Sequence, residues 1–405
     1  MTIKKPNKAN IKETILDHQK LEELFSTPSA AREIIYVFQG GGALGAFQVG
    51  AVNALSEHGY SPDMLVGISI GAINASIVAG NKPEDRINRL NQFWDTITTT
   101  VPFPMMKNLG LAKIHNSISA NYSMLLGQPG FFKPRAYNPW LLPDTTVDQL
   151  SFYDTAPLKD TLEQLIDFDY LNKNGPRICL GAVDLESGEF EFFDSKLIKI
   201  GPEHIMASCA LPPGFPPIKI DDRYYIDGGV FSNTPLSKVI DEFADSDNEI
   251  KNVLCFMVDL FSSSGILPHS MDGIMERIKD IQYSSHSKRN NSFYATTQNL
   301  SHAIHFLSNK LSEDALKDAQ VQEVLKLGFA HRMDIIRIIY HSEKGTELHS
   351  KDYEFSKESA NIHRQSGYKQ TKLLIKEQEA SWQKKHQSGV TVYKIEANKT
   401  SEHKV

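Results

Sequence analysis

The chain has 405 residues, of which 40% are hydrophobic and 23% charged, so it can bury a large core. This composition excludes disordered, collagen-like and disulfide-scaffold proteins. Its 43 Lys and Arg residues against 49 Asp and Glu residues give a net charge of −6, which lacks the positive field of a general nucleic-acid binder. Cys179, Cys209 and Cys255 lie far apart without a CxxC spacing. They predict neither a disulfide framework nor a zinc site, and they favour a reducing compartment.

The N-terminal segment, residues 1–31, is rich in lysine but has no apolar stretch after its basic residues. We therefore expect no signal peptide and a cytoplasmic protein. Residues 64–81 carry no charge, a length near the lower limit for a membrane-spanning helix. Glycine, serine and asparagine interrupt this run, so it is better explained as a buried strand that turns into a buried helix. No transmembrane span is predicted.

Two strand–turn–helix units follow each other near the N-terminus. In the first, the apolar sequence EIIYVF leads into GGG, and apolar residues then recur at helical spacing from Leu44 to Leu55. The second unit has a strand at 65–68 and a helix at 72–79. Tandem units of this kind predict an α/β fold with a parallel sheet.

The rest of the chain divides by composition. Residues 100–140 are rich in methionine and aromatic residues without a clear period, which indicates an insertion. Further strands are expected at 177–183, 189–193, 218–226 and 252–260, helical periodicity begins at Ser270, and 334–342 resembles a strand. We therefore expect a charged segment at 1–31, an α/β domain at 32–267, and a mostly helical module with a hydrophilic tail at 268–405.

The sequence GISIG contains a candidate nucleophile, Ser69, between Gly67 and Gly71. The pattern GxSxG places a serine on a sharp turn from strand to helix, where small flanking residues let the backbone bend. Here it follows an apolar run and begins a helix, as this chemistry requires. The helix start also directs free N–H groups toward the serine. A plain buried turn is the alternative.

A second glycine-rich turn, GGGALG, spans Gly40 to Gly45. Adjacent glycines let neighbouring N–H groups converge on one point, as in an oxyanion hole. A phosphate loop would need Lys and Ser or Thr at its end, but Ala46 and Phe47 follow Gly45. The pattern GxGxxG of a dinucleotide site is present, yet the acid expected after the second strand is missing, because Asp63 precedes that strand.

The third motif is Asp227 followed by Gly228 and Gly229. An aspartate at the end of a strand, with glycines beside it, has space around its carboxylate and could act as a general base. Taken alone, Asp-Gly-Gly is also typical of a turn in which the aspartate caps its own backbone.

Together the three motifs resemble the patatin-like phospholipases, over about residues 34–260. The resemblance rests on GGGALG, on GISIGA and on ASCALPPGFPPIKIDDRYYIDGGVFSNTP, which is similar to the second catalytic block of that family. GQPGFFKPR and DYEFSKESANIHRQSGY resemble a bacterial subgroup with an extended C-terminal region. The resemblance implies a patatin-like three-layer sandwich with a mostly helical C-terminal extension.

The resemblance also implies a serine acyl hydrolase with a Ser-Asp dyad. Ser69 would be the nucleophile and Asp227 its activating group, and no metal or other cofactor would be needed. The oxyanion hole would be formed at Gly41, Gly42 and Ala43. The remaining motif glycines are Gly40, Gly45, Gly67, Gly71, Gly228 and Gly229. One departure is Leu44, where many members carry Arg or Lys. The implied substrates are acyl esters of phospholipids or lysophospholipids, encountered in solution or at a membrane surface; the oligomeric state is left open.

Two alternatives remain. An α/β hydrolase would use the order serine, acid, histidine, with His286, His302 or His305 as the third member, although its serine normally comes later in the chain. A non-catalytic binding protein could keep the same fold. The intact pair of Ser69 and Asp227 argues against that second alternative.

Overall fold

The computed structural model describes residues 32–100, 111–244, 252–325, 327–328, 332–341, 347–383, 389–396 and 399–404. Its centre is a ten-stranded sheet in the order β12-β11-β10-β9-β1-β2-β5-β8-β7, with β6 paired to β5. The strands are β1 (Glu33–Phe38), β2 (Met64–Gly67), β5 (Arg177–Asp184), β6 (Phe190–Asp194), β7 (Ile218–Ile220), β8 (Arg223–Asp227), β9 (Asn252–Asp259), β10 (Arg332–Ile339), β11 (Gly389–Glu396) and β12 (Lys399–Lys404). The pairings from β11 through β5 are parallel, and β6, β7, β8 and β12 pair antiparallel.

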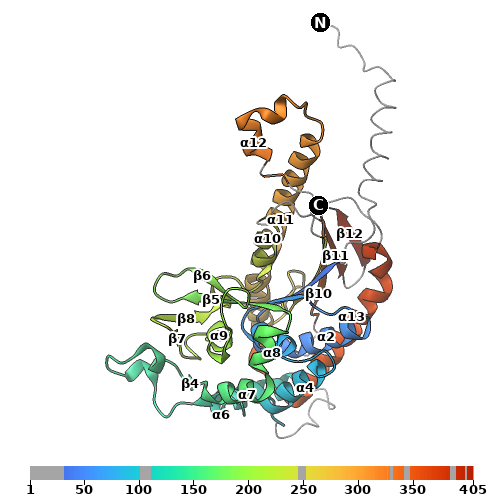
Figure 1. Ribbon diagram of the computed structural model, residues 1–405. Coiled ribbons are helices and arrows are strands. Elements are labelled where there is room, and N and C mark those ends of the chain that lie inside the picture. The colour runs from blue at the N-terminus through green and yellow to red at the C-terminus, as the bar shows by residue number, and fades with distance from the viewer. Residues whose placement is uncertain are drawn as a thin grey trace.

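Helices cover both faces of this sheet (Figure 1). They are α2 (Ala46–Glu57), α3 (Ile70–Ala79), α4 (Arg86–Ile97), α6 (Ala112–Leu126), α7 (Ala156–Leu165), α8 (Phe168–Lys173), α9 (Pro202–Ser208), α10 (Leu236–Ala244), α11 (Met271–Ser308), α12 (Ala319–Leu325) and α13 (Lys357–Gln383). Because side chains alternate along a strand, Tyr36 and Phe38 of β1 pack in the core that α2 and α13 share. Ile35 and Val37 pack in a second core with α10. The predicted three-layer α/β sandwich is confirmed.

Most of the expected strands are present, but one expected strand is divided into two, and four strands, β3 (Lys133–Pro134), β4 (Tyr153–Asp154), β11 and β12, were not expected. The segment 218–226 forms two strands, β7 and β8, because the chain turns at Asp221, whose φ of 53° is left-handed. Within the insertion at 100–140, α6 forms, and β3 pairs with β4. The part of the insertion at 101–110 lies outside the described residues. The described part of the segment that the sequence analysis left without a period therefore contains a helix followed by a short strand.

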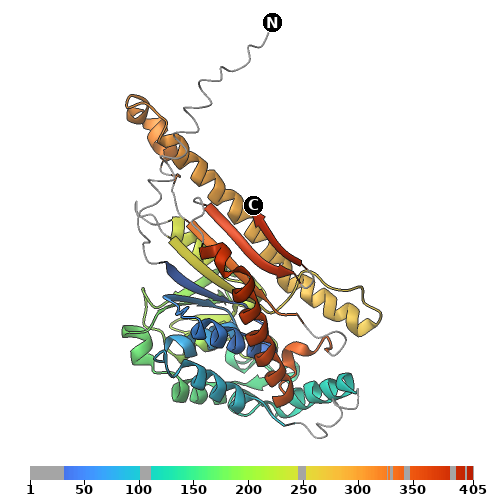
Figure 2. The same ribbon diagram turned by 90° about the vertical axis from the view of Figure 1, so that its right-hand side faces the viewer.

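The C-terminal region is built into the same sandwich. Strands β10, β11 and β12 extend the sheet beyond β9, and α13 lies across α2 (Figure 2). A Cβ on Gly50 of α2 would lie 1.9 Å from the carbonyl oxygen of Arg364, and one on Gly367 of α13 would lie 2.0 Å from that of Phe47. The two helices can approach this closely only through glycines. The division of the chain at residue 267 stays a prediction.

The cysteines and helices give two further findings. Cys179, Cys209 and Cys255 are all buried and unpaired. Among the described residues, no helix combines the length and the apolar character needed to cross a membrane.

Candidate active site

Ser69 lies on the turn between β2 and α3, with φ 56° and ψ −130°. A left-handed φ is strained for a residue with a side chain and marks the sharp turn that the GxSxG pattern predicts. The flanking glycines are required by close backbone packing. A Cβ on Gly67 would lie 2.5 Å from the carbonyl oxygen of Gly71, and one on Gly71 would lie 2.5 Å from that of Phe38.

Neighbouring groups fix the backbone of Ser69. Its N–H donates to the carbonyl oxygen of Ser208 at 3.0 Å, and the Oγ of Ser208 lies 3.2 Å from the same nitrogen. That Oγ donates to the carbonyl oxygen of Gly181 at 2.6 Å. The Cys209 thiol donates to the carbonyl oxygen of Ser69 at 3.0 Å. These contacts hold the strained turn in place, so the backbone atoms that carry the Ser69 side chain are fixed in position.

Strand register brings Asp227 to the same edge of the sheet. Leu180 of β5 pairs with Gly67 at the end of β2, and Ala182, two residues further along β5, pairs with Asp227 at the end of β8. Asp227 therefore lies at the same position along the strand direction as Ser69, which is two residues beyond Gly67. The Ser69 side chain lies beside the Asp227 carboxylate and favours its charged form, and the Gly229 N–H donates to the carboxylate at 2.7 Å.

The Asp227 carboxyl is 1% exposed. Burial disfavours its charged form and raises its pKa to about 6, although the interactions with the Ser69 side chain and the Gly229 N–H act in the opposite direction. A carboxylate with this pKa is a stronger base than one on the surface. Burial also raises the pKa of the Cys209 thiol, and the charge of Asp227 adds to the effect, which leaves this cysteine a weak nucleophile.

The GGG turn lies against Ser69 on the other side. A Cβ on Gly40 would be 3.0 Å from the Ser69 Cβ and 2.5 Å from the Asn233 Oδ1. Gly40 and Asn233 are joined by two hydrogen bonds, Gly40 N–H to the Asn233 carbonyl at 3.2 Å and Asn233 Nδ2 to the Gly40 carbonyl at 2.9 Å. Gly41 and Gly42 line the cavity above Ser69. Ala43 is buried and is not among the lining residues.

Ser69 and Asp227 lie in a cavity of about 310 Å³. Its walls come from several separate parts of the chain, among them the insertion, the loop after α9, and the C-terminal region. The aromatic lining residues are Phe131, Phe132, Tyr153, Phe215, Phe261, Tyr283, Tyr353 and Phe355. Four of them are packed edge to face or tilted against one another, with ring centroids 5.1 to 5.8 Å apart for the pairs Phe131–Phe215, Phe131–Phe355 and Phe132–Phe215. The cavity is thus predominantly apolar, with the polar pair on its wall.

The residues that line this cavity include no histidine, among those that the structure describes. His204 accepts a hydrogen bond from the Gly201 N–H and packs against Phe193, and His58 contacts the Ala54 carbonyl. The side chains of His286 and His302 lie outside the described residues. Within the described part of the chain, no group of three or more His, Cys, Asp or Glu residues could hold a metal ion.

The sequence analysis missed two kinds of site residue. Gln39 accepts hydrogen bonds from the N–H groups of Leu260 and Phe261 through its Oε1, at 2.5 and 3.1 Å, so it braces the GGG turn. The available signal in the sequence was a polar residue, Gln39, between the apolar strand and the glycine motif. Tyr283, Asp352, Tyr353 and Phe355 also line the cavity, although they lie in the C-terminal module, in which the sequence analysis proposed no residue of the Ser-Asp site.

Sequence comparison agrees with the motifs. Residues 36–240 match the family described as patatin-like phospholipase, and residues 281–388 match one described as patatin phospholipase. No curated protein sequence matches the chain.

Two solved structures are similar to the chain at low identity. VipD from Legionella pneumophila is 15% identical over 85% of this chain and 67% of its own, with a TM-score of 0.36. The type III effector protein ExoU is 12% identical over 86% of this chain, with a TM-score of 0.34, and the match spans 53% of the ExoU chain. The family match covers half of the sequence and includes both the Ser69 turn and Asp227. The chain therefore belongs to the patatin-like phospholipase family, whose members are lipid-hydrolysing esterases.

Proposed function

We propose that this protein is a serine acyl hydrolase that cleaves fatty acyl esters of phospholipids or lysophospholipids through Ser69 and Asp227. The observation that carries the proposal is the position of these two side chains beside each other on the wall of an apolar cavity, with Ser69 stabilising the charged form of Asp227. A serine hydroxyl is a poor nucleophile until a base within hydrogen-bond reach takes its proton. Asp227 meets both conditions, because its carboxylate lies beside the Ser69 side chain and its raised pKa makes it a stronger base.

In the first half of the reaction, the Ser69 Oγ attacks the acyl carbonyl carbon and its proton passes to Asp227. The carbonyl oxygen becomes an oxyanion, for which the N–H groups at Gly41 and Gly42, with Ala43 as a further candidate, are the proposed donors. When the tetrahedral intermediate collapses, the ester C–O bond breaks. The leaving alcohol or lysophospholipid takes the proton from Asp227, and an acyl-Ser69 ester remains.

In the second half, a water molecule attacks the acyl-Ser69 ester and transfers a proton to Asp227. Collapse of the second intermediate releases the fatty acid, and Ser69 regains its proton. The sequence balances with one water consumed per ester, and Asp227 acts first as base and then as acid in each half. No metal or organic cofactor takes part in any step.

The cavity supports an acyl substrate because its aromatic and aliphatic walls suit a hydrocarbon chain. Phe131, Phe132 and Met124 of the insertion belong to this lining. We therefore assign the insertion to acyl-chain binding, in addition to its part in the local apolar core.

The decisive experiment combines labelling with a fluorophosphonate and a substrate panel of phosphatidylcholine, lysophosphatidylcholine and a soluble p-nitrophenyl ester. We expect the wild-type protein to be labelled. Ser69→Ala should abolish labelling, and Ser69→Ala and Asp227→Asn should each lower turnover by about a thousandfold or more, because each removes half of one mechanism. The double variant should be little worse than either.

Matched controls are Ser187→Ala and Asp222→Asn, which change the same residue types at exposed positions. Near-wild-type turnover in either active-site variant would contradict the assignment. The panel also tests the two alternatives. A comparable loss in His204→Ala or His305→Ala, with the variant folded, would restore a histidine-dependent triad, and no labelling of the wild-type protein would favour a binding protein.

A further inference from the structure

The first turns of α11, residues 271–282, are arranged with their apolar side outward. Apart from Gln282, every exposed residue in this stretch is apolar. These residues are Met271, Ile274, Met275, Ile278 and Ile281, and they are between 42% and 72% exposed. Their spacing of three and four residues places them on one face of the helix. A surface helix normally has the opposite arrangement, with its polar face toward water.

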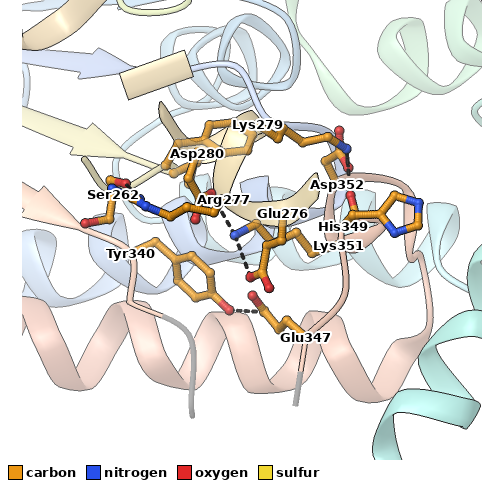
Figure 3. A network of polar contacts seen from close by, with 12 residues as sticks. Ser262, Glu276, Arg277, Lys279, Asp280, Tyr340, Glu347, His349, Lys351 and Asp352 are labelled. Carbon is orange, nitrogen blue, oxygen red and sulfur yellow. Dashed lines mark hydrogen bonds and ion pairs between the residues drawn. The ribbon is translucent and has the colours of Figure 1, made fainter. Parts of the chain in front are cut away.

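The charged residues of the same helix turn inward, and each has a partner in the protein (Figure 3). Lys351, which is buried, pairs with Glu276 at 3.1 Å and Asp280 at 2.8 Å. The remaining pairs are Lys279 with Asp352 at 2.6 Å, Asp272 with His349, and Arg277 with the Ser262 carbonyl at 2.9 Å. The charged face is therefore fully engaged by residues 349–352 and by the loop after β9.

This pairing fixes which side of the helix faces solvent. Rotating α11 to bury its apolar face would separate these ion pairs and deprive the buried Lys351 of its partners Glu276 and Asp280, which is strongly unfavourable. The outward apolar face is thus a stable property of the fold. Contiguous exposed apolar surface of this kind marks an interaction site.

Helix α11 also borders the Ser69 cavity. Tyr283, which follows Lys279 and Asp280 on the inward side of α11, lines that cavity together with Asp352 and Tyr353. Residues 351–353 also contact α6. The end of α6 also exposes apolar side chains, those of Met124, Leu125 and Leu126, and Met124 lines the cavity. In Figure 2 the beginning of α11 and α6 lie on the same side of the molecule.

We propose that the apolar face of residues 271–281, together with the exposed end of α6, docks on the surface of a phospholipid layer. We call these residues the docking face. The inference rests on the proposed function, because a phospholipid must leave such a layer to reach Ser69. Two apolar helix surfaces from distant parts of the chain border one cavity mouth, and a lipid surface can receive both at once. A single partner helix would cover only the apolar face of α11 and would leave the end of α6 exposed.

The experiment measures binding to unilamellar vesicles of phosphatidylcholine and phosphatidylglycerol by flotation. The test variant is Ile274→Asp with Ile278→Asp, and the matched control is Leu197→Asp with Ile198→Asp, another exposed apolar pair in the turn after β6. We expect the test variant to lower the partition coefficient by about tenfold or more, since two side chains no longer transfer into hydrocarbon. The control should bind as the wild-type protein does.

A second measurement reports contact directly. The three native cysteines are buried, so a thiol-reactive environment-sensitive dye can be attached selectively to Ile278→Cys. Vesicles should increase the fluorescence of this protein and leave that of a labelled Leu197→Cys protein unchanged.

Soluble-ester turnover separates this inference from the proposed function. If Ile274→Asp with Ile278→Asp loses vesicle binding and keeps soluble-ester turnover, the docking face is supported. If the wild-type protein hydrolyses no ester but the same variant still loses binding, the proposed function fails and the docking face stands. The docking face would be overturned if the variant bound vesicles as the wild-type protein does, or if the dye at residue 278 did not respond to vesicles. If the variant binds vesicles as the wild-type protein does but changes from a dimer to a monomer, the apolar face of α11 would instead be assigned to contact with a second copy of the chain.

Discussion

Replacing Asp227 by asparagine should change activity and stability in opposite directions. The carboxylate that we assign as the base is fully buried, and burial raises its pKa from 3.8 to about 6. Between these two values the folded protein holds a proton that the unfolded chain has already released. Stability attributable to this group is therefore present at low pH and is lost as the pH rises through the folded-state pKa.

The magnitude follows from the size of the pKa shift. Each pKa unit corresponds to about 1.4 kcal/mol, so the ionised Asp227 lowers the free energy of unfolding by roughly 3 kcal/mol once the pH exceeds about 7. Asparagine is uncharged at every pH and keeps nearly the same shape. We therefore expect the stability of Asp227→Asn, relative to the wild-type protein, to increase by about 2 kcal/mol between about pH 4.5 and about pH 8.

Urea unfolding of both proteins across this pH range measures the difference. Asp222→Asn is the matched control, because Asp222 is exposed on the neighbouring turn and its replacement should not produce this trend. A difference between Asp227→Asn and the wild-type protein that does not vary with pH would refute the reasoning. It would mean that Asp227 carries no buried charge in the folded protein.

Three further predictions concern the site and its support. Turnover of a soluble ester, kcat/KM, should rise with pH through about 6, since the proposed base must be ionised, and a profile that is flat between about pH 5 and 8 would contradict Asp227 as the base. Gly42→Ala should lower kcat/KM at least about tenfold, because its φ is +54° and a Cβ would lie 2.0 Å from the Asp352 carbonyl oxygen; a fully active variant would show that this turn can relax. A chain ending at Leu267 should aggregate or be rapidly proteolysed, since it exposes the edge of β9 and uncovers α2; a protease-resistant monomer would show that residues 32–267 fold alone.

The local geometry around Ser69 and Asp227 could be predicted because backbone requirements and residue types coincide there. Only glycine fits beside the Ser69 turn, so the sequence shows where the chain bends sharply. The pattern of tandem strand–helix units then places the ends of β1 and β2 side by side. The position of Asp227 could be predicted only from the resemblance, because its antiparallel register with β5 is a long-range contact that no local pattern specifies.

The contribution of the C-terminal region could not be predicted in this way. Tyr283, Asp352 and Phe355 are ordinary residues of helical or loop sequence until the sheet extension and α13 bring them to the cavity. The docking face shows the same limit. Periodicity predicts a helix from Ser270 and shows that it has an apolar face, but the direction of that face depends on partners more than 65 residues away, such as Lys351.

The apolar cavity and the basicity of Asp227 have a common physical origin. A dyad without histidine needs a carboxylate with a pKa well above that of a surface aspartate, and desolvation is the largest cause of the raised pKa of Asp227. The aromatic residues that suit an acyl chain also keep water from this carboxylate, and Tyr283 and Phe355 supply part of that wall from the C-terminal region. An acyl chain that displaces water from the cavity would desolvate Asp227 further and strengthen the base when the ester carbonyl is in place. In the proposed mechanism, substrate binding and base activation are therefore one event, and the C-terminal region takes part in both.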